Sequence, residues 1–597
     1  MVKVSDLVAE FLQKNKIKTV FGIIGSANSH IFDSINDLGY TEIINTHHEQ
    51  AAVMAMGAHY RASGKLSAAI VTAGGGASNA ITGVVSNWAD SIPGIIISGN
   101  ESSYHIKEHS DLRMYGTQGF NVTKMVEDVT KYSHCLVDEN NIQLELEKCL
   151  SISNKDRKGP TWLDIPFNIQ SKTVNKQPWN DLTEKVPSNL VDYSKFLVNA
   201  INEAKRPLIL GGHGIRLSES KEQFKQFINS TQIPTTLTWS GIDLLESDNP
   251  NFFGRFGLYG QRGANYIVQN CDLLIVLGSR LALPQTGYDW SEFVREGKII
   301  CVDIDKLQAP KEYIDLHIKE NVKYVLDQLL LKKSNINPID PNWLEYCQSK
   351  KEKFPWIDTE HEHTDNYLNS YQFMDKLSNH LKDDHIVVTD MGTALLSGHQ
   401  AIKLKSNQKM FTSLGLGEMG YGIAGAIGAA AACPNQDVLC LNCDGGIMMN
   451  LQELHTAIEN NLNIKVVIFN NDGYLMIKHT QKMLFKGKYV SVDKKTGIGL
   501  PNFSKLLPAF GYEYFQLKDW DLTDTTINSF LNYDGPSVLE VFMDPEQGFL
   551  PKVKGVPKSD GSFLAPPIEE MSPLVSLDKL KEEMLVGISD KSKEIKR

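Results

Sequence analysis

Short runs of apolar, often β-branched residues alternate with longer stretches of helical periodicity along most of the chain. Most of these runs end near Gly, Ser or Asn, and an amphipathic stretch follows. This alternation is typical of parallel sheets, because a strand buried on both faces needs a crossover helix to reach the next strand. The predicted strands lie at 19–24, 42–46, 68–72 and 94–98, then at 207–211, 273–278 and 299–304, and finally at 386–389, 438–443 and 464–470.

These runs fall into three blocks, which predict an α/β protein with three doubly wound parallel-sheet domains. Polar stretches at 170–189 and 332–365 separate the blocks and are expected to hold the domain boundaries. The charged residues 589–597 are expected to form a frayed tail. The expected divisions are 1–180, 190–335 and 365–560 for the three domains and 561–597 for a C-terminal extension.

Composition and net charge limit the kinds of molecule that this protein is expected to bind. The chain has 597 residues, 42% hydrophobic and 22% charged, which is ordinary for a globular protein long enough to bury several cores. Its 60 basic and 71 acidic side chains leave a formal charge of −11. A chain this acidic lacks the basic footprint that nucleic acid or an anionic membrane demands, so neither is an expected partner.

Cysteine usage and the absence of an apolar leader indicate a cytoplasmic protein. Eight cysteines are too few for a disulfide scaffold in a chain of this length. Cys440 and Cys443 have C-x-x-C spacing, but residues three apart on a strand point to opposite faces, which disfavours a shared metal. The N-terminus lacks an apolar signal core, and the longest apolar stretch, 422–433, is too short to span a bilayer.

A glycine-rich turn at 415–420 matches G-x-G-x-x-G and opens a helix rich in Gly and Ala. The acidic residue Asp444 ends a predicted strand 24 residues after Gly420, which is close to the fingerprint of a dinucleotide site. Helices of this composition also begin after glycines simply to pack closely. A nicotinamide site, a phosphate site for another cofactor and a purely structural turn therefore all remain open.

Asp444 and Asn471 end two successive predicted strands, 27 residues apart, which is about one strand–helix–strand unit. Ligands bind at the carboxyl ends of strands in open α/β sheets. A carboxylate, an amide oxygen and a main-chain carbonyl form a set of hard oxygen ligands that suits Mg²⁺ completed by diphosphate oxygens. The alternative is two ordinary turns, since Asp-Gly and Asn-Asp-Gly are common turn formers.

Four segments together resemble a known family. The stretch 443–471 resembles the thiamine diphosphate motif, which usually begins Gly-Asp-Gly and ends Asn-Asn. Residues 47–52 resemble the segment that holds the family's catalytic glutamate, and 72–79 resemble its Gly-rich turn. Residues 415–422 match the form that acetolactate synthases have beneath the cofactor. The chain is thus similar to thiamine diphosphate-dependent enzymes of the acetolactate synthase and pyruvate decarboxylase superfamily. These enzymes have a pyrimidine-binding domain, a central domain and a diphosphate-binding domain.

The resemblance implies thiamine diphosphate and Mg²⁺ as cofactors and assigns a role to each matching residue. Glu49 would hydrogen-bond the pyrimidine ring of the cofactor, and Gln118 would lie near the reacting carbon. Met419 would hold the cofactor in its folded shape, and the Gly417 carbonyl would accept from its amine. The other implied cofactor residues are Gly25, Gly75, Asn79, Gly392, Thr393, Gly445, Gly446 and Met476, and the implied metal residues are Asp444, Asn471 and Gly473.

The central block resembles that of acetolactate synthases, in which the residue matching Arg280 contacts FAD, so FAD is a further candidate cofactor. Leu-Ala-Leu-Pro at 281–284 replaces the Phe-Asp-Asp-Arg of those enzymes, and Thr480 replaces a tryptophan that selects the second 2-oxo acid. The stretches 280–290 and 559–584 look more like related enzymes of surface-polysaccharide pathways. Some of those transfer a two-carbon acyl unit from pyruvate to a keto-sugar.

The expected function is therefore a 2-oxo acid decarboxylating carboligase that transfers an acyl group to a carbonyl acceptor such as a keto-sugar. One alternative is an acetolactate synthase that joins two 2-oxo acids. A second is a cofactor-binding homologue without activity, because Cys443 and Gly446 depart from the usual motif. The resemblance also implies a homodimer or homotetramer with active sites at the subunit interface.

Overall fold

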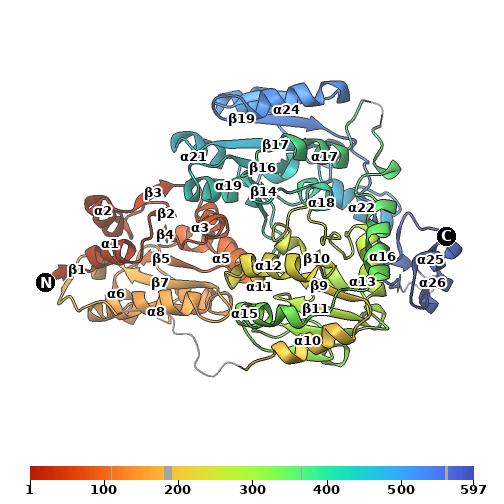
Figure 1. Ribbon diagram of the computed structural model, residues 1–597. Coiled ribbons are helices and arrows are strands. Elements are labelled where there is room, and N and C mark those ends of the chain that lie inside the picture. The colour runs from red at the N-terminus through yellow and green to blue at the C-terminus, as the bar shows by residue number, and fades with distance from the viewer. Residues whose placement is uncertain (109–110, 181–190, 365, 558–562) are drawn as a thin grey trace. The chain divides into compact units, whose positions relative to one another are not determined.

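The computed structural model describes residues 1–108, 111–180, 191–364, 366–557 and 563–597 (Figure 1). The chain forms two compact units. Unit 1 comprises residues 1–186, 384–395 and 409–545, and unit 2 comprises 187–383, 396–408 and 546–597. Unit 1 contains two six-stranded sheets and unit 2 contains a five-stranded sheet.

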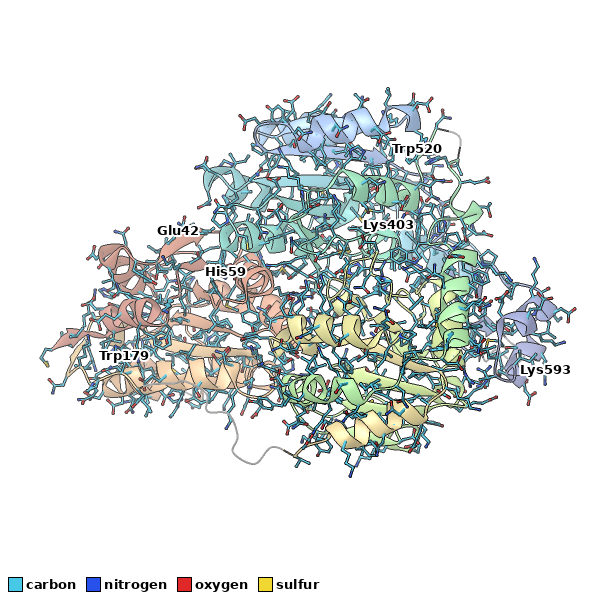
Figure 2. All side chains as sticks on the ribbon, in the orientation of Figure 1. Glu42, His59, Trp179, Lys403, Trp520 and Lys593 are labelled. Carbon is cyan, nitrogen blue, oxygen red and sulfur yellow. The ribbon has the colours of Figure 1, made fainter. Side chains whose placement is uncertain are left out.

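The first sheet of unit 1 is parallel, with strand order β3-β2-β4-β5-β7-β6. Side chains alternate between its faces, so Ile95 and Ile97 pack under α1 and α8 whereas Ile96 packs under α3. Trp179 packs against helix α1, and its ring centre lies 5.8 Å from that of Phe11 (Figure 2). The elements are β2 (Thr19–Gly22), β3 (Glu42–Asn45), β4 (Ala68–Val71), β5 (Gly94–Asn100), β6 (Tyr132–Cys135), β7 (Pro160–Pro166), α1 (Val4–Lys14), α2 (Ser29–Leu38), α3 (Glu49–Ser63), α4 (Gly75–Asn79), α5 (Ile81–Ala89) and α8 (Ile142–Asn154).

The second sheet of unit 1 is also parallel, with strand order β15-β14-β16-β17-β19-β18. Helix α19 shares one apolar core with α3 of the first sheet. The two helices touch closely, because a Cβ on Gly428 would lie only 2.1 Å from the Ala55 carbonyl oxygen. The elements are β14 (Ile386–Thr389), β15 (Lys409–Phe411), β16 (Val438–Cys443), β17 (Ile464–Asn470), β18 (Glu513–Leu517), β19 (Ser537–Phe542), α19 (Tyr421–Ala432), α20 (Asp444–Ile447), α21 (Glu453–Glu459), α22 (Leu475–Leu484), α23 (Phe503–Ala509) and α24 (Thr523–Leu531). Helix α18 (Thr393–Ala401) begins in unit 1 and continues into unit 2.

Unit 2 is built on a parallel sheet with strand order β10-β9-β11-β12-β13. The predicted fold class is confirmed, since the three large sheets are parallel and helices cover them (Figure 1). None of the helices in the described ranges combines the length and apolar character needed to cross a bilayer. The elements are β9 (Pro207–Gly211), β10 (Thr235–Leu237), β11 (Leu273–Leu277), β12 (Lys298–Val302), β13 (Leu316–Ile318), α10 (Ser194–Glu203), α12 (Lys221–Thr231), α13 (Arg262–Asn270), α15 (Val322–Lys332), α16 (Pro341–Lys353) and α17 (Ser370–His380).

The C-terminal residues of unit 2 differ from the sequence-based expectation. Helices α25 (Leu577–Glu583) and α26 (Asp590–Glu594) form there, and Glu583 accepts hydrogen bonds from Lys350 and Lys353 of α16. At the very end, Arg597 makes a 2.6 Å ion pair with the buried Glu570. The prediction of a frayed tail at 589–597 is therefore wrong, because a buried carboxylate holds the last basic residue. The polar stretch 332–365, expected to be a boundary, likewise contains the folded helix α16. The boundary expected at 170–189 lies partly outside the described residues.

Candidate active site

Glu49 is the first residue of α3 and is 7% exposed. His48 caps the helix, since its Nδ1 accepts from the Gln50 N–H at 3.1 Å. The Asn79 side-chain amide donates to Glu49 Oε2 at 3.0 Å. The second carboxylate oxygen faces Gly76, where an added Cβ would lie 3.1 Å away. One oxygen of a buried carboxyl is thus oriented by an amide, and the other lies against a residue without a side chain.

The glycine-rich turn after β4 forms the surroundings of Glu49. Gly74 has φ +64° and leads into α4, and a Cβ on the following Gly75 would meet open space. Gly25 packs against this turn, because a Cβ there would lie 2.4 Å from the Thr72 hydroxyl oxygen. Gln118 also lies beside it, 3.0 Å from the position of a Cβ on Gly74. The structure therefore brings the expected residues of the first domain together around one carboxyl.

Asp444 lies at the carboxyl end of β16 and is fully buried. Its Oδ1 accepts from the Gly445 N–H at 2.7 Å, and its Oδ2 accepts from the N–H groups of Asn471 at 2.9 Å and Gly473 at 3.1 Å. Burial raises the pKa of Asp444 to about 7 despite these three donors. The loop after β17 is thereby fixed to the end of β16, as the spacing of Asp444 and Asn471 predicted.

Two features of this pair fit a divalent cation. The Asn471 Oδ1 is buried and has no hydrogen-bond partner among the described residues, and buried polar atoms are rarely left so. A buried carboxylate beside it would regain its charge on binding Mg²⁺. No group of three His, Cys, Asp or Glu side chains in the described residues could hold a metal. A site with one carboxylate would have to be completed by amide, carbonyl and diphosphate oxygens.

The turn that begins α18 lies against the same strand end. Gly392 has φ +84°, and Thr393 starts the helix and is buried. The Cys443 thiol accepts from the Ala394 N–H at 3.4 Å and donates to the Met391 carbonyl at 3.3 Å. Burial raises the pKa of this thiol, so it stays neutral and can do both. The cysteine in place of the motif glycine therefore links β16 to the turn rather than blocking it.

The motif glycine Gly445 and Gly446, which departs from the usual motif, are both buried in α20. Gly445 packs on the Tyr474 ring, since a Cβ there would lie 2.4 Å from it. Met476 is half-buried at the start of α22, and Thr480 is exposed one turn later. Arg280, the expected FAD contact, belongs to unit 2, where it is exposed after the end of β11.

Asp390 is a site residue that the sequence analysis missed. Its carboxylate accepts from the N–H groups of Met391 at 2.7 Å and Gly420 at 2.9 Å, and burial raises its pKa to about 7. It thereby ties the glycine-rich turn to the end of β14, and a Cβ on Gly417 would lie 3.6 Å from the Met391 sulfur. The half-buried Met419 lies in the same segment. The only sequence signal was an acidic residue at the end of a predicted strand, just before Gly392.

The glycine motif does not offer a dinucleotide site. The N–H groups of Leu414 and Gly415 donate to Asp90 at 3.1 and 2.8 Å, and Gly420 donates to Asp390. Two buried carboxylates thus occupy the amides that a pyrophosphate would need, and their charge would oppose it. Asp90 also pairs with Arg61 at 2.9 Å. The nicotinamide alternative is therefore not supported by the structure.

The two sheets of unit 1 are also connected at the start of α3. The His47 N–H donates to the Glu453 carboxylate at 3.1 Å, and its ring lies 2.9 Å from the Thr456 hydroxyl. Burial raises the pKa of Glu453, and its hydrogen bonds oppose this rise. Helix α21 therefore helps to fix the residues directly before Glu49.

Comparison with known families shows to which family this chain belongs. Three family models match the chain in order. The thiamine pyrophosphate enzyme N-terminal TPP binding domain matches residues 2–125, the central domain 195–329, and the C-terminal TPP binding domain 390–541. The chain belongs to the thiamine pyrophosphate enzymes. Glu49 lies in the first matched range, and Asp444 and Asn471 lie in the last.

Curated relatives of this thiamine pyrophosphate enzyme match it along most of its length. It is 29% identical over 553 residues to the acetolactate synthase isozyme 2 large subunit of Escherichia coli K12, covering 92% of this chain and 96% of the relative. The isozyme 1 large subunit of the same organism is 29% identical over 554 residues, covering 92% and 95%. A probable acetolactate synthase large subunit of Methanocaldococcus jannaschii is 28% identical over 571 residues, covering 92% and 93%.

Proposed function

We propose that this thiamine diphosphate-dependent enzyme decarboxylates a 2-oxo acid such as pyruvate and transfers the acyl group to a carbonyl acceptor. The observation that carries the proposal is the oriented carboxyl of Glu49, in the same compact unit as the Asp444–Asn471 pair. The relatives named as acetolactate synthases support C–C bond formation as the reaction class.

When bound, thiamine diphosphate supplies the electron sink for decarboxylation and for the new carbon–carbon bond. Glu49 would exchange a proton with the pyrimidine ring through one carboxyl oxygen, and Asn79 keeps the other oxygen in place. Gln118, which lies beside Gly74, would be near the reacting carbon. Gly25 packs closely on Thr72, and the open space beside Gly75 would leave room for the cofactor. Such an oriented acid–base group typically contributes about 10²–10⁴-fold to the rate.

The diphosphate end is assigned to unit 1 residues at the ends of β14, β16 and β17. Asp444, Asn471 and the Gly473 carbonyl would hold Mg²⁺, because their oxygens are hard ligands. The remaining proposed cofactor contacts are Gly392, Thr393, Gly417, Met419, Gly445, Gly446 and Met476. We further assign residues 1–180, 190–335 and 365–560 to the pyrimidine-binding, central and diphosphate-binding domains, with 561–597 as the C-terminal extension.

The acceptor distinguishes this proposal from its main alternative. An acetolactate synthase joining two 2-oxo acids agrees equally well with the named relatives. Thr480 and residues 281–284 favour a different acceptor, since they replace residues tied to acetolactate formation. A keto-sugar is the class we propose. Mass spectrometry of products from pyruvate with keto-acid, aldehyde and keto-sugar panels tests it, and acetolactate as the only product would overturn it.

We also propose that unit 2 binds FAD as a structural cofactor. Arg280 would contact it, because this side chain is exposed and makes no ion pair with a described carboxylate. The carboxyl ends of β9 and β11, between which the strand order reverses, are where an α/β sheet binds a nucleotide. Flavin absorbance in the purified protein would support binding, and a colourless protein that takes up no added FAD would refute it.

We propose a homodimer or homotetramer in which each active site lies at a subunit interface. Apolar side chains exposed near the proposed cofactor residues support this, since such patches mark interfaces. They are Leu416, Met448, Met449 and Ile477. Analytical ultracentrifugation of the cofactor-loaded protein tests the assembly, and a fully active monomer would contradict it.

A further inference from the structure

The loop that follows α22, residues 485–498, carries one dominant sign of charge. It contains Lys486, Lys488, Lys494 and Lys495 against a single acid, Asp493, in a chain whose formal charge is −11. All four lysines are exposed, and none makes an ion pair with a carboxylate of the described residues. We call residues 485–498 the lysine loop.

The backbone of the lysine loop is attached to the proposed metal site. The Tyr474 N–H donates to the Val492 carbonyl at 2.8 Å. The same carbonyl lies so close to Gly473 that an added Cβ would be 2.0 Å away, and Gly473 has φ +136°. The loop therefore passes directly over one of the three residues proposed to hold Mg²⁺.

Asp493, the only acidic residue of the lysine loop, already has a basic partner outside the loop. Asp493 faces the buried Lys478 of α22 at 3.6 Å, and this neighbour and hydrogen bonds from Thr496 hold the pKa of Asp493 below its usual value. Asp493 also caps the short turn that contains Lys494 and Lys495, so these two lysines follow a fixed residue. The charge of the four exposed lysines is thus left uncompensated.

A second tether holds the far side of the loop. The Gln481 side chain donates to the Val490 carbonyl and accepts from the Val490 N–H, both at 2.9 Å. Two apolar side chains of the same loop, Phe485 and Val490, are 56% and 66% exposed. A fixed surface that combines several cations with apolar groups suits an organic anion better than a small inorganic ion.

We propose that the lysine loop binds a phosphate or diphosphate group carried by the carbonyl acceptor, an inference that rests on the proposed function. The 2-oxo acid donor has one carboxylate, which needs no such cluster. A phosphorylated acceptor carries several negative charges, for which lysine ammonium groups act as point-charge partners. Isolated surface lysines are ordinarily only hydrated. Here four of them, none in an ion pair with a described carboxylate, belong to one loop whose backbone lies against Gly473.

The test uses the protein loaded with thiamine diphosphate and Mg²⁺, so that the cofactor's own diphosphate site is filled. Uridine 5′-diphosphate serves as the probe and uridine as its uncharged counterpart, with calorimetric titration at low and high salt. We expect the diphosphate to bind, uridine to bind at least about tenfold more weakly, and added salt to weaken only the diphosphate.

The paired variant Lys494→Gln/Lys495→Gln should weaken diphosphate binding by about tenfold. The matched control is Lys311→Gln/Lys319→Gln, which removes two exposed charges from unit 2 and should bind the probe like the wild type. Thermal unfolding checks that each variant is folded. Equal binding by both variants, or no binding of the probe to the loaded protein, would overturn the inference. Failure to load thiamine diphosphate would instead count against the proposed function.

Discussion

The side-chain amide of Asn79 donates a 3.0 Å hydrogen bond to the carboxylate of Glu49. The two residues lie at the end of α4 and the start of α3, 30 positions apart. Because an amide N–H can only donate, it fixes one oxygen of Glu49 as an acceptor and leaves the other to act on a ligand. The proposed role of Glu49 depends on this orientation.

Replacing Glu49 with Gln should lower turnover by about 10²–10⁴-fold, because the amide cannot exchange a proton with the pyrimidine ring. Thiamine diphosphate should still bind, since the replacement is isosteric. Glu42→Gln is the matched control, because Glu42 is exposed on edge strand β3 of the same sheet (Figure 2). Steady-state rates and calorimetric cofactor binding measure the two effects. A Glu49→Gln enzyme with wild-type turnover would refute the assignment.

Replacing Asp444 with Asn should weaken Mg²⁺-dependent cofactor binding by at least about tenfold. The variant loses the charge that attracts the metal, and its NH₂ group would face backbone N–H donors that now have a carboxylate. Asp472→Asn is the control, since Asp472 is exposed and has φ +58°, which Asn tolerates. Titration of thiamine diphosphate with Mg²⁺ and with EDTA gives the readout. Equal binding by the two variants would argue against a metal at Asp444.

Restoring the motif glycine in Cys443→Gly should weaken cofactor binding by about three- to tenfold. The thiol links Met391 and Ala394, and its two weak bonds together contribute about as much as one ordinary hydrogen bond, about 0.5–1.5 kcal/mol. Cys443→Ser should stay closer to the wild type, because a hydroxyl can make both bonds. If the glycine variant bound thiamine diphosphate as tightly as the wild type, the thiol would have no positioning role.

His59, on the same helix as Glu49, should make the fold sensitive to acid. Burial lowers the pKa of His59 from 6.5 to about 4, so the folded state keeps the ring neutral. Below pH 6.5 the unfolded chain binds a proton that the folded chain does not, so stability is lost as the pH falls toward 4. Between pH 6.5 and 5 the loss is about 2 kcal/mol. Thermal midpoints at pH 7.5 and 5 should differ less in His59→Gln, and an unchanged difference would exclude His59 as the cause.

Much of the fold could be predicted because the residues of the central strands and of the adjoining turns form recognisable local sequence patterns. Strands β9, β14, β16 and β17 begin and end at the predicted residues, since each is a mostly apolar run bounded by turn formers. Strand β7 was missed because prolines bound it and Asp164 interrupts it. In the fold Asp164 accepts from Ser98 at 2.5 Å and Asn100 at 2.6 Å, which no local pattern encodes.

Some residues of the candidate site were predicted from the sequence, and others were not. Asp444 and Asn471 follow the ends of two strands, so their spacing predicted that they lie together, whereas Glu49 was predicted only from the family resemblance. Asp390 was overlooked because its partner Gly420 lies 30 residues away, and Asp90 because Gly415 lies 325 residues away. The first contact forms only when the second sheet is assembled, and the second only when the two sheets of unit 1 pack together. They also show why the glycine motif suggested a dinucleotide site that the structure does not support.

The most direct test of the account is CO₂ release from pyruvate by the purified protein. We predict release that requires both thiamine diphosphate and Mg²⁺ and that is nearly abolished in Glu49→Gln. Release by the wild type would also separate the enzyme from an inactive, cofactor-binding homologue. A protein that binds thiamine diphosphate with Mg²⁺ but releases no CO₂ above background, from pyruvate or from other 2-oxo acids, would contradict the account.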